Sequence, residues 1–300
     1  MEGVTFYLDS EVALMEYLQR SMGPVLTLVA SVVTFFGEET LVVVFMGFLY
    51  WVWDKEAAEF IGTNVLVGTV VNPFLKNFAL RRRPYFDHPS IQCLKPAHAG
   101  DIYDISLQGY SFPSGHSSNA VIFYGSLARK RHIIAIGLPL FVGLSRVILG
   151  VHYPTDVLAG WISGAVVLLG LSKLQRMVIQ KERLYIVLAV VFLPGFFICK
   201  TNDFYTCYGI WCGFFTARML DERVVHFEST RNPRAAVLRM ATGLALFGVL
   251  NVLCKLPFSD AFLHSATTGQ FLFRAARYFL LSFLMLGVYP MTFSRVKVLS

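Results

Sequence analysis

Charged residues are scarce in this chain of 300 residues. Asp, Glu, Lys and Arg together make up 15% of it, against roughly 25% of a typical soluble domain. Apolar residues reach 55%, including 27 phenylalanines, and the mean hydropathy is +0.58. So few polar side chains cannot cover a water-soluble globule of this size. The composition excludes a disordered chain, a coiled coil and most soluble enzymes, and it predicts an all-α polytopic membrane bundle.

Cysteine is scarce as well. The five cysteines show no spacing typical of metal ligands, and Cys207 and Cys212 lie within one apolar run. We therefore expect buried free thiols rather than a disulfide framework or a metal site.

Apolar runs alternate with short polar breaks, which predicts about nine transmembrane helices. We place them at residues 38–53, 57–79, 113–128, 133–151, 155–172, 184–199, 204–219, 236–254 and 270–290. The run at 24–36 is short for a span, because its length as a helix is only ~20 Å of a ~30 Å bilayer core. It is either re-entrant or continues the preceding segment, 1–23, which has the pattern of an amphipathic interfacial helix.

The net charge of +7 is informative through its distribution. If the turn at Lys55 is cytoplasmic, every second connection is cytoplasmic too, and these connections hold more than half of the 26 basic residues. They are Lys55, Arg129, Lys130, Arg131, Lys173, Arg176, Lys181, Arg183, Arg218, Arg223, Arg231, Arg234, Arg239, Arg295 and Lys297. Two opposite breaks hold one basic residue each, Lys200 and Lys255. This asymmetry follows the positive-inside rule, and it orients the chain.

The longest break, residues 80–112, is an exception to that rule. It lies on the non-cytoplasmic side yet opens with Arg81, Arg82 and Arg83. Long loops in compact folds are often functional. Arg81 and Arg82 either attract a second phosphate or anionic headgroups, or they anchor the chain at the membrane interface.

Three polar clusters fall at the non-cytoplasmic ends of predicted spans, so they can converge on one site. The first runs from Lys76 to Pro84, the second from Phe112 to His116, and the third from Ser145 to Asp156. Lys76, Arg83 and Arg146 place three cations next to apolar spans, where charge is costly and usually functional. Three cations together favour an anion, and arginine can bind phosphate oxygens with two parallel hydrogen bonds.

The second and third clusters carry features of helix starts. Pro113 suits the first position of a helix, and the backbone N–H groups near Ser114 and Gly115 then face an anion such as phosphate. Pro154 likewise predicts a helix start. Asp156 in its first turn can accept the proton of one imidazole nitrogen of His152 and leave the other nitrogen as a nucleophile.

The pattern K-x6-R-P, then P-S-G-H, then S-R-x5-H-x3-D resembles the type 2 phosphatidic acid phosphatase superfamily. All three motifs are present without substitution between Lys76 and Asp156. The resemblance implies a metal-independent phosphatase that forms a phosphohistidine and needs no cofactor. It implies His152 as the nucleophile, Asp156 as its orienting partner and His116 as the general acid. The residues it implies for phosphate binding are Lys76, Arg83, Ser114, Gly115, Ser145 and Arg146.

The resulting organisation is an interfacial segment at 1–23, a catalytic membrane core at 24–200 and additional transmembrane helices at 201–300. We expect hydrolysis of a lipid phosphate or polyprenyl pyrophosphate, with the bilayer and the lipid as partners and no nucleic acid. We expect a bacterial cytoplasmic membrane, with the active site facing outward, and the endoplasmic reticulum is the alternative location. A lipid-to-lipid or lipid-to-sugar phosphotransferase, a sugar-phosphate phosphatase, and a non-catalytic lipid transporter or scramblase on the same fold are the alternatives.

Overall fold

The structure, a computed structural model of the chain, describes residues 3–95, 101–128, 132–296 and 298–299. These residues form helices without a named strand, and an isolated bridge pairs Val4 with Arg81. The helices before residue 150 are α1 (Asp9–Ser21), α2 (Pro24–Phe35), α3 (Glu39–Phe48), α4 (Lys55–Ala79), α5 (Pro84–Asp87), α6 (Ile105–Gln108), α7 (Gly115–Leu127) and α8 (His132–Ile148). The later helices are α9 (Pro154–Met177), α10 (Lys181–Phe192), α11 (Gly195–Ile198), α12 (Asn202–Leu220), α13 (Pro233–Leu253), α14 (Asp260–Leu263) and α15 (Thr268–Phe283). The predicted all-α fold class is confirmed.

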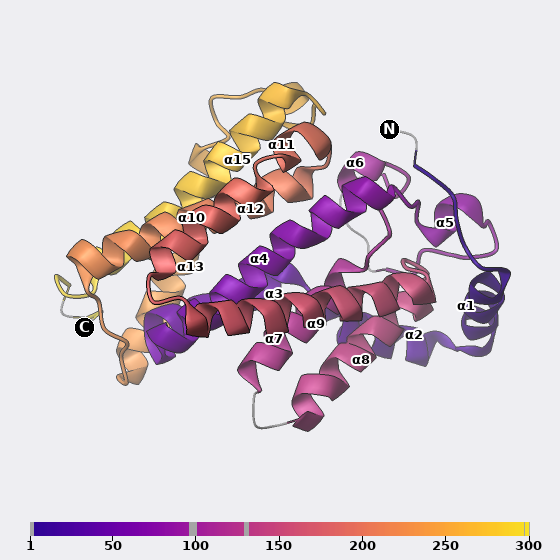
Figure 1. Cartoon of the computed structure of the whole chain (residues 1–300), viewed down its shortest axis with the longest axis horizontal. Helices are drawn as coiled ribbons and strands as arrows, with labels where there is room; N and C mark the ends of the chain where they lie inside the picture. The colour runs from indigo at the N-terminus through magenta and orange to yellow at the C-terminus, as the bar shows by residue number, and fades with distance from the viewer. Residues whose placement is uncertain (1–2, 96–100, 129–131, 297, 300) are drawn as a thin grey trace.

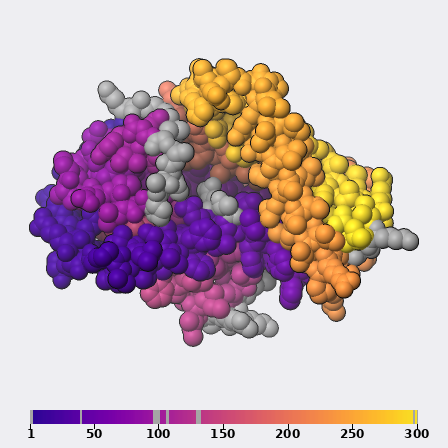
Figure 2. Space-filling view, turned by 180° about the vertical axis from the view of Figure 1, so that it is seen from behind, coloured from indigo at the N-terminus to yellow at the C-terminus, as the bar shows by residue number. Residues whose placement is uncertain are grey.

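Helix α4 lies between two groups of helices (Figure 1). In the first group, α4 packs against α7 and α9, and α8 packs against α7 and α2. In the second group, α4 packs against α12, which pairs with α15. Seen from behind, the N-terminal segment lies at one end of the molecule and the orange and yellow C-terminal helices lie at the other (Figure 2). Lys76 therefore lies on the helix that both groups contact.

The two helices that follow the predicted motifs begin differently. Helix α9 begins at Pro154, as expected, with Asp156 in its first turn. Helix α7 begins at Gly115 instead of Pro113, and Ser114 is its N-cap because its side chain accepts a hydrogen bond from the Ser117 N–H. The prediction that Pro113 is the first helical residue is wrong, since a serine caps free N–H groups whereas a proline cannot.

All nine segments predicted as spans are helical, but the count of nine spans is not confirmed. Among the described residues, four helical segments are long and apolar enough to cross a bilayer: Lys55–Ala79, Pro154–Met177, Pro233–Leu253 and Thr268–Thr292. Helices α1 and α2 bend by 117° at their junction and make a fifth span only if counted as one broken helix. Shorter helices account for most of the difference. For example, α7 has 13 residues, a length of about 20 Å. Helix α12, by contrast, has 19 residues but is not among the segments that are apolar enough.

Burial separates a central helix from a peripheral one. Within their most apolar stretches, 72% of α4 is buried but only 11% of α13. Leu244, Val249 and Val252 are among the exposed apolar side chains of α13. An exposed apolar surface of this kind matches the hydrocarbon core of a membrane. The basic residues expected in two cytoplasmic segments, Arg129, Lys130, Arg131 and Lys297, lie outside the described residues.

Two pairs of glycines allow neighbouring helices to approach closely. A Cβ at Gly160 in α9 would lie 2.6 Å from the Ser114 carbonyl oxygen, and one at Gly164 would lie 2.7 Å from that of Ser118. In α12, a Cβ at Gly209 or Gly213 would lie within 2.5 Å of a carbonyl oxygen of α15. Small residues four apart are a common means of close helix packing in membranes. The first pair fixes the start of α7, with His116, against α9.

Candidate active site

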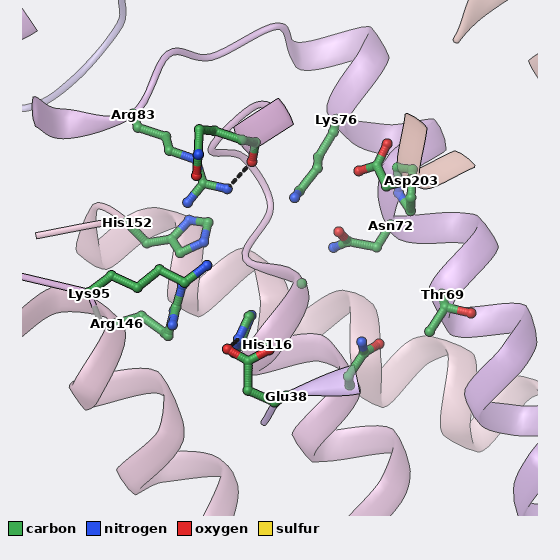
Figure 3. A pocket seen from close by; sticks show the side chains of 14 residues that line it. Glu38, Thr69, Asn72, Lys76, Arg83, Lys95, His116, Arg146, His152 and Asp203 are labelled. Atoms are coloured by element: carbon green, nitrogen blue, oxygen red, sulfur yellow. Dashed lines mark hydrogen bonds and ion pairs between the residues drawn. The ribbon is translucent and has the colours of Figure 1, made fainter. Parts of the chain in front are cut away.

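The three predicted clusters meet at one cavity of about 300 Å³. Its walls come from α4, α6, α7, α8, α12, the turn between α2 and α3, the loop after α4 and the segment before α9 (Figure 3). Six of the predicted site residues line it: Lys76, Arg83, Gly115, His116, Arg146 and His152. The order of the motifs along the chain therefore does correspond to a single site.

Arginine side chains in the cavity are held by fixed polar partners. The guanidinium of Arg83 donates to the carbonyl oxygens of Gln108, Gly109 and Val151, at 2.5, 3.1 and 3.3 Å. Arg146, 1% exposed, donates to the Thr34 hydroxyl of α2 at 2.6 Å. Neutral partners orient these cations without neutralising them, so their charge remains available to an anion.

Lys95 is a fourth basic residue in the cavity wall, and the motifs do not include it. It comes from the loop after α4, and its side chain points into the cavity beside Arg146 and His152 (Figure 3). Burial lowers the pKa of Lys95 to about 8, with a further contribution from the charges of Arg146 and Arg83. Its charge therefore changes just above neutral pH.

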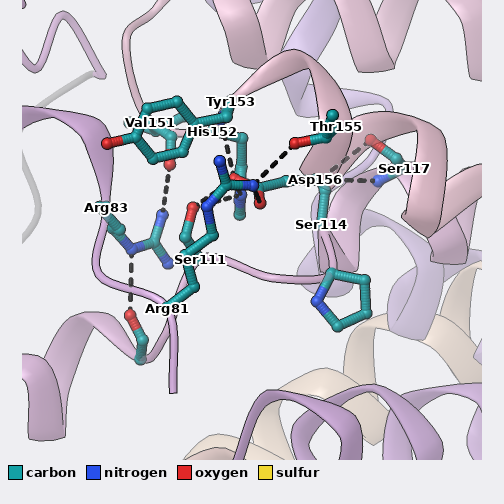
Figure 4. A network of polar contacts seen from close by, with 12 residues as sticks. Arg81, Arg83, Ser111, Ser114, Ser117, Val151, His152, Tyr153, Thr155 and Asp156 are labelled. Atoms are coloured by element: carbon teal, nitrogen blue, oxygen red, sulfur yellow. Dashed lines mark hydrogen bonds and ion pairs between the residues drawn. The ribbon is translucent and has the colours of Figure 1, made fainter. Parts of the chain in front are cut away.

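His152 is backed by a carboxylate, as the sequence predicts. It is 2% exposed, and its Nδ1 lies 3.5 Å from Oδ2 of Asp156. The Ser111 hydroxyl bridges the two residues, because its oxygen lies 2.5 Å from Asp156 Oδ2 and 3.3 Å from His152 Nδ1 (Figure 4). Burial, followed by the charges of Arg83, Arg146 and Lys76, holds the pKa of His152 well below its usual range. The imidazole is therefore neutral at neutral pH, and Nδ1 is the ring nitrogen that faces Asp156.

Arg81 lies behind this pair and not in the cavity. Its guanidinium contacts Asp156 Oδ1 at 2.6 Å and Glu11 Oε2 of α1 at 3.0 Å, and it is 1% exposed. The rings of Phe6 and Tyr153 lie 4.6 and 4.0 Å from its central carbon. Neither role considered for Arg81, phosphate attraction or interfacial anchoring, is correct, because its donors are occupied by buried acidic groups. Its neighbour Arg82 is 37% exposed and pairs with Asp87 at 2.5 Å.

The second histidine also has an acidic neighbour. His116 Nε2 lies 3.2 Å from Oε1 of Glu38, in the turn between α2 and α3. Gly115, directly before it, faces the other wall of the cavity: a Cβ there would lie 3.0 Å from the Asn72 side-chain oxygen. At the start of α7, the His116 side chain thus faces one wall of the cavity, and the backbone of Gly115, which has no side chain, faces the opposite wall.

Two predicted phosphate-binding serines do not line the cavity. Ser114 caps α7 and its backbone N–H donates to the Asp156 carbonyl oxygen at 2.9 Å. The Ser145 hydroxyl donates to the Val142 carbonyl oxygen at 2.7 Å. Both are buried; Ser114 joins the start of α7 to the start of α9, whereas the hydrogen bond of Ser145 stays within α8.

Several residues of the site were not predicted from the motifs. Lys95, Glu38, Asn72 and Asp203 line the cavity, and Ser111 and Glu11 lie behind it. One signal was present in the sequence. Acidic and basic residues beside apolar segments are costly and few in this chain, so each is a candidate for function.

Comparison with protein families matches two regions of the chain. Residues 57–180 match the PAP2 superfamily, and residues 205–300 match the transmembrane extension of PAP2 superfamily phosphatases. The chain belongs to the PAP2 superfamily. The predicted resemblance to type 2 phosphatidic acid phosphatases is thereby confirmed, and the helices after residue 200 correspond to the extension of this PAP2 protein. Glu11 and Glu38 precede both matched regions.

Curated relatives align with parts of the PAP2 protein. Phosphatidylglycerophosphatase B of Bacillus subtilis is 38% identical over 88 residues, which cover 25% of this chain and 42% of the relative. Decaprenylphosphoryl-5-phosphoribose phosphatase of Mycobacterium tuberculosis is 36% identical over 112 residues, covering 35% and 54%. The chain thus spans about half the length of these relatives. A crystal structure of a transmembrane PAP2-type phosphatidylglycerolphosphate phosphatase from Bacillus subtilis aligns with a TM-score of 0.43 and 25% identity, over 57% of this chain and 87% of that one.

Proposed function

We propose that this protein is an integral-membrane, metal-independent phosphatase that acts on a lipid phosphate or polyprenyl pyrophosphate through a phosphohistidine. The observation that carries the proposal is His152. It is a buried neutral imidazole, with Asp156 and Ser111 at one nitrogen, in a cavity lined by four basic side chains. This arrangement supports nucleophilic attack by the other nitrogen.

The first step joins His152 Nε2 to phosphorus and breaks the bond from phosphorus to the leaving oxygen. Negative charge spreads over the three equatorial oxygens of the transferring group. Lys76, Arg83, Arg146 and the first N–H groups of α7 are directed at that charge. Preorganised donors of this kind are worth about 3–4 kcal/mol each in a partly dry site.

The second step returns the enzyme to its starting state. His116 gives a proton to the leaving oxygen in the first step. It then accepts a proton from water as the water attacks phosphorus and releases His152. The proton balance closes over the two steps, and inorganic phosphate leaves.

A lipid is the favoured substrate class because apolar surface surrounds the cationic cavity. The relatives named above act, by their names, on a phosphatidylglycerol phosphate and on a decaprenyl phosphate derivative. Both are amphiphiles with a phosphate group, which matches a polar cavity at one end of apolar helices.

We propose that the cavity faces away from the cytoplasm, in a bacterial cytoplasmic membrane. Helix α4 begins at Lys55, at its end far from the cavity. The corresponding end of α9 carries Lys173 and Arg176. Basic residues concentrate on the cytoplasmic side of membrane proteins. A cysteine label at an exposed residue such as Tyr103, tested with an impermeant reagent in intact cells, would report the side directly.

Phosphate release by purified protein in detergent tests the function. We expect hydrolysis of phosphatidic acid or undecaprenyl pyrophosphate in excess EDTA, and loss of turnover in His152→Ala. With radiolabelled substrate and gel electrophoresis without an acid quench, we expect a labelled phosphoenzyme in the active protein but not in that variant. The label should be stable to alkali and labile to acid. Full turnover by His152→Ala contradicts the mechanism.

A substrate panel separates hydrolysis from the alternatives. It contains phosphatidic acid, phosphatidylglycerophosphate, undecaprenyl pyrophosphate, sphingosine phosphate and glucose 6-phosphate. Label recovered as inorganic phosphate supports a hydrolase, whereas label recovered on an added lipid or sugar acceptor supports a phosphotransferase.

A further inference from the structure

Glu38 is an acidic residue in a site built for an anion. Its carboxylate lines the same cavity as Lys76, Arg83, Lys95 and Arg146, and its Oε1 lies 3.2 Å from His116 Nε2 (Figure 3). The side chains of His116 and Glu38 are only 18% and 26% exposed. A carboxylate inside an anion-binding cavity repels phosphate. The position of Glu38 therefore indicates a role other than substrate binding.

The turn that carries Glu38 is fixed to the helix that carries His116. The Tyr124 hydroxyl of α7 donates to the Phe36 carbonyl oxygen at 2.9 Å. A Cβ at Gly37 would lie 2.6 Å from Val142 Cγ1 and 3.2 Å from His116 Cβ, so the backbone of the turn lies directly against the histidine. Glu38 therefore approaches His116 from a packed turn, not from a loose loop.

An imidazole that contacts a carboxylate through one nitrogen has a defined tautomer and orientation, and its protonated form is stabilised. Both properties are needed by a general acid. The cations that line the cavity, Arg146 among them, disfavour a proton on His116. The Glu38 carboxylate beside Nε2 acts in the opposite direction and favours that proton.

Resting on the proposed function, we propose that Glu38 is a positioning residue that holds Nε2 of His116, so that Nδ1 delivers the proton to the leaving oxygen. Residue 38 precedes the region matched to the PAP2 superfamily, which begins at residue 57. The N-terminal segment thus supplies part of the proton-transfer apparatus of this chain. In the step concerned, His152 Nε2 bonds to phosphorus, the P–O bond breaks, and the leaving oxygen takes the Nδ1 proton of His116.

The test compares two leaving groups. Phosphatidic acid releases an alcohol, which needs a proton, whereas diacylglycerol pyrophosphate of the same acyl chains releases a phosphate group, which leaves without one. Since kcat/KM reports formation of the phosphoenzyme, it isolates the step in which His116 acts as the acid. Glu38→Gln should lower kcat/KM for phosphatidic acid by about 10²-fold and change that for the pyrophosphate little. Glu38→Asp should restore part of the loss.

Two further variants distinguish a positioning role of Glu38 from a general loss of folding or activity. Glu56→Gln, an exposed glutamate at the opposite end of α4, should behave as the unmodified protein on both lipids. In a His116→Ala background, Glu38→Gln should cause no additional loss, because a residue that acts through His116 has nothing left to act on. Additive losses, or equal losses on both lipids, overturn the inference while leaving the phosphatase intact. An unmodified protein that hydrolyses neither of these lipids nor undecaprenyl pyrophosphate overturns the proposed function itself.

Discussion

Arg81 and Asp156 form a buried ion pair directly behind His152. The Nη1 atom of Arg81 lies 2.6 Å from Oδ1 of Asp156, and the two side chains are 1% and 0% exposed. The other carboxylate oxygen of Asp156 accepts hydrogen bonds from Ser111 and from the Tyr153 N–H. Glu11 of α1 completes the group by contacting both Arg81 and Thr155. The orientation of the His152 side chain therefore depends on residues from α1, the loop after α4 and the start of α9.

Replacing Arg81 should destabilise the protein. Arg81→Met leaves Asp156 and Glu11 buried without their cation, and breaking one side of a buried pair costs about 3–5 kcal/mol. The apparent melting temperature in detergent should fall clearly. Arg82→Met is the matched control and should cost less, since the Arg82 side chain is 37% exposed and its partner Asp87 keeps the hydrogen bond from the Thr5 hydroxyl. Equal effects of the two substitutions would contradict the buried-pair interpretation.

Removing the Ser111 hydroxyl should slow phosphoenzyme formation without unfolding the chain. The hydroxyl bridges Asp156 and His152, and a hydrogen bond to a charged group is worth about 1.5–3 kcal/mol. Ser111→Ala should therefore lower kcat by about 10- to 100-fold with little change in KM. Ser111→Thr keeps the hydroxyl and should retain more activity. An unchanged kcat in Ser111→Ala would show that the direct Asp156–His152 contact is sufficient.

Lys95 predicts a pH dependence. Its pKa is lowered to about 8 by burial and by Arg146 and Arg83, so its charge is present below that pH and is lost as the pH rises through it. If Lys95 contributes to phosphate binding, kcat/KM of the unmodified protein should fall between pH 7 and 9. The pH dependence of kcat/KM reports groups of the free enzyme.

Two substitutions identify Lys95 as the source. Lys95→Arg keeps a cation over this range and should remove the alkaline fall. Lys95→Met should give a low kcat/KM at pH 7 that declines no further toward pH 9. A fall that persists in both variants must originate from another group.

The motifs located both histidines and three of the four basic residues of the cavity, because each motif places polar or charged residues at the end of a helix. Lys76 lies in the last turn of α4 and Arg83 follows that helix, and His152 and Asp156 flank the start of α9. Once α4 and α9 are helices in one bundle, these positions converge. The acidic partner of His152 could be predicted from the sequence, but that of His116 could not. Asp156 is four residues from His152, whereas Glu38 is far from His116 in the sequence, and only tertiary packing of the α2–α3 turn brings them together.

The number of spans could not be read from apolar runs alone. The run at 184–199 is interrupted between α10 and α11 by Leu193 and Pro194, and proline removes a backbone donor from the helix. The run at 113–128 forms only the 13 residues of α7, because Ser114 caps it. Hydropathy records how apolar a segment is, whereas crossing a bilayer also requires an uninterrupted length.

The contact between α7 and α9 gives a final prediction, because these helices carry His116 and follow His152. A Cβ at Gly160 would lie 2.6 Å from the Ser114 carbonyl oxygen and 2.9 Å from Ser117 Cβ. Since backbone cannot move aside cheaply, Gly160→Ala should separate the helices. We expect it to destabilise the protein by about 1–3 kcal/mol and to reduce kcat, measured by thermal unfolding in detergent and phosphate release. Gly170→Ala, in the same helix with nothing within 4 Å of the added Cβ, should be neutral or stabilising by up to about 1 kcal/mol. If Gly160→Ala matches Gly170→Ala in both measurements, the close α7–α9 contact is not what holds the two histidines in place.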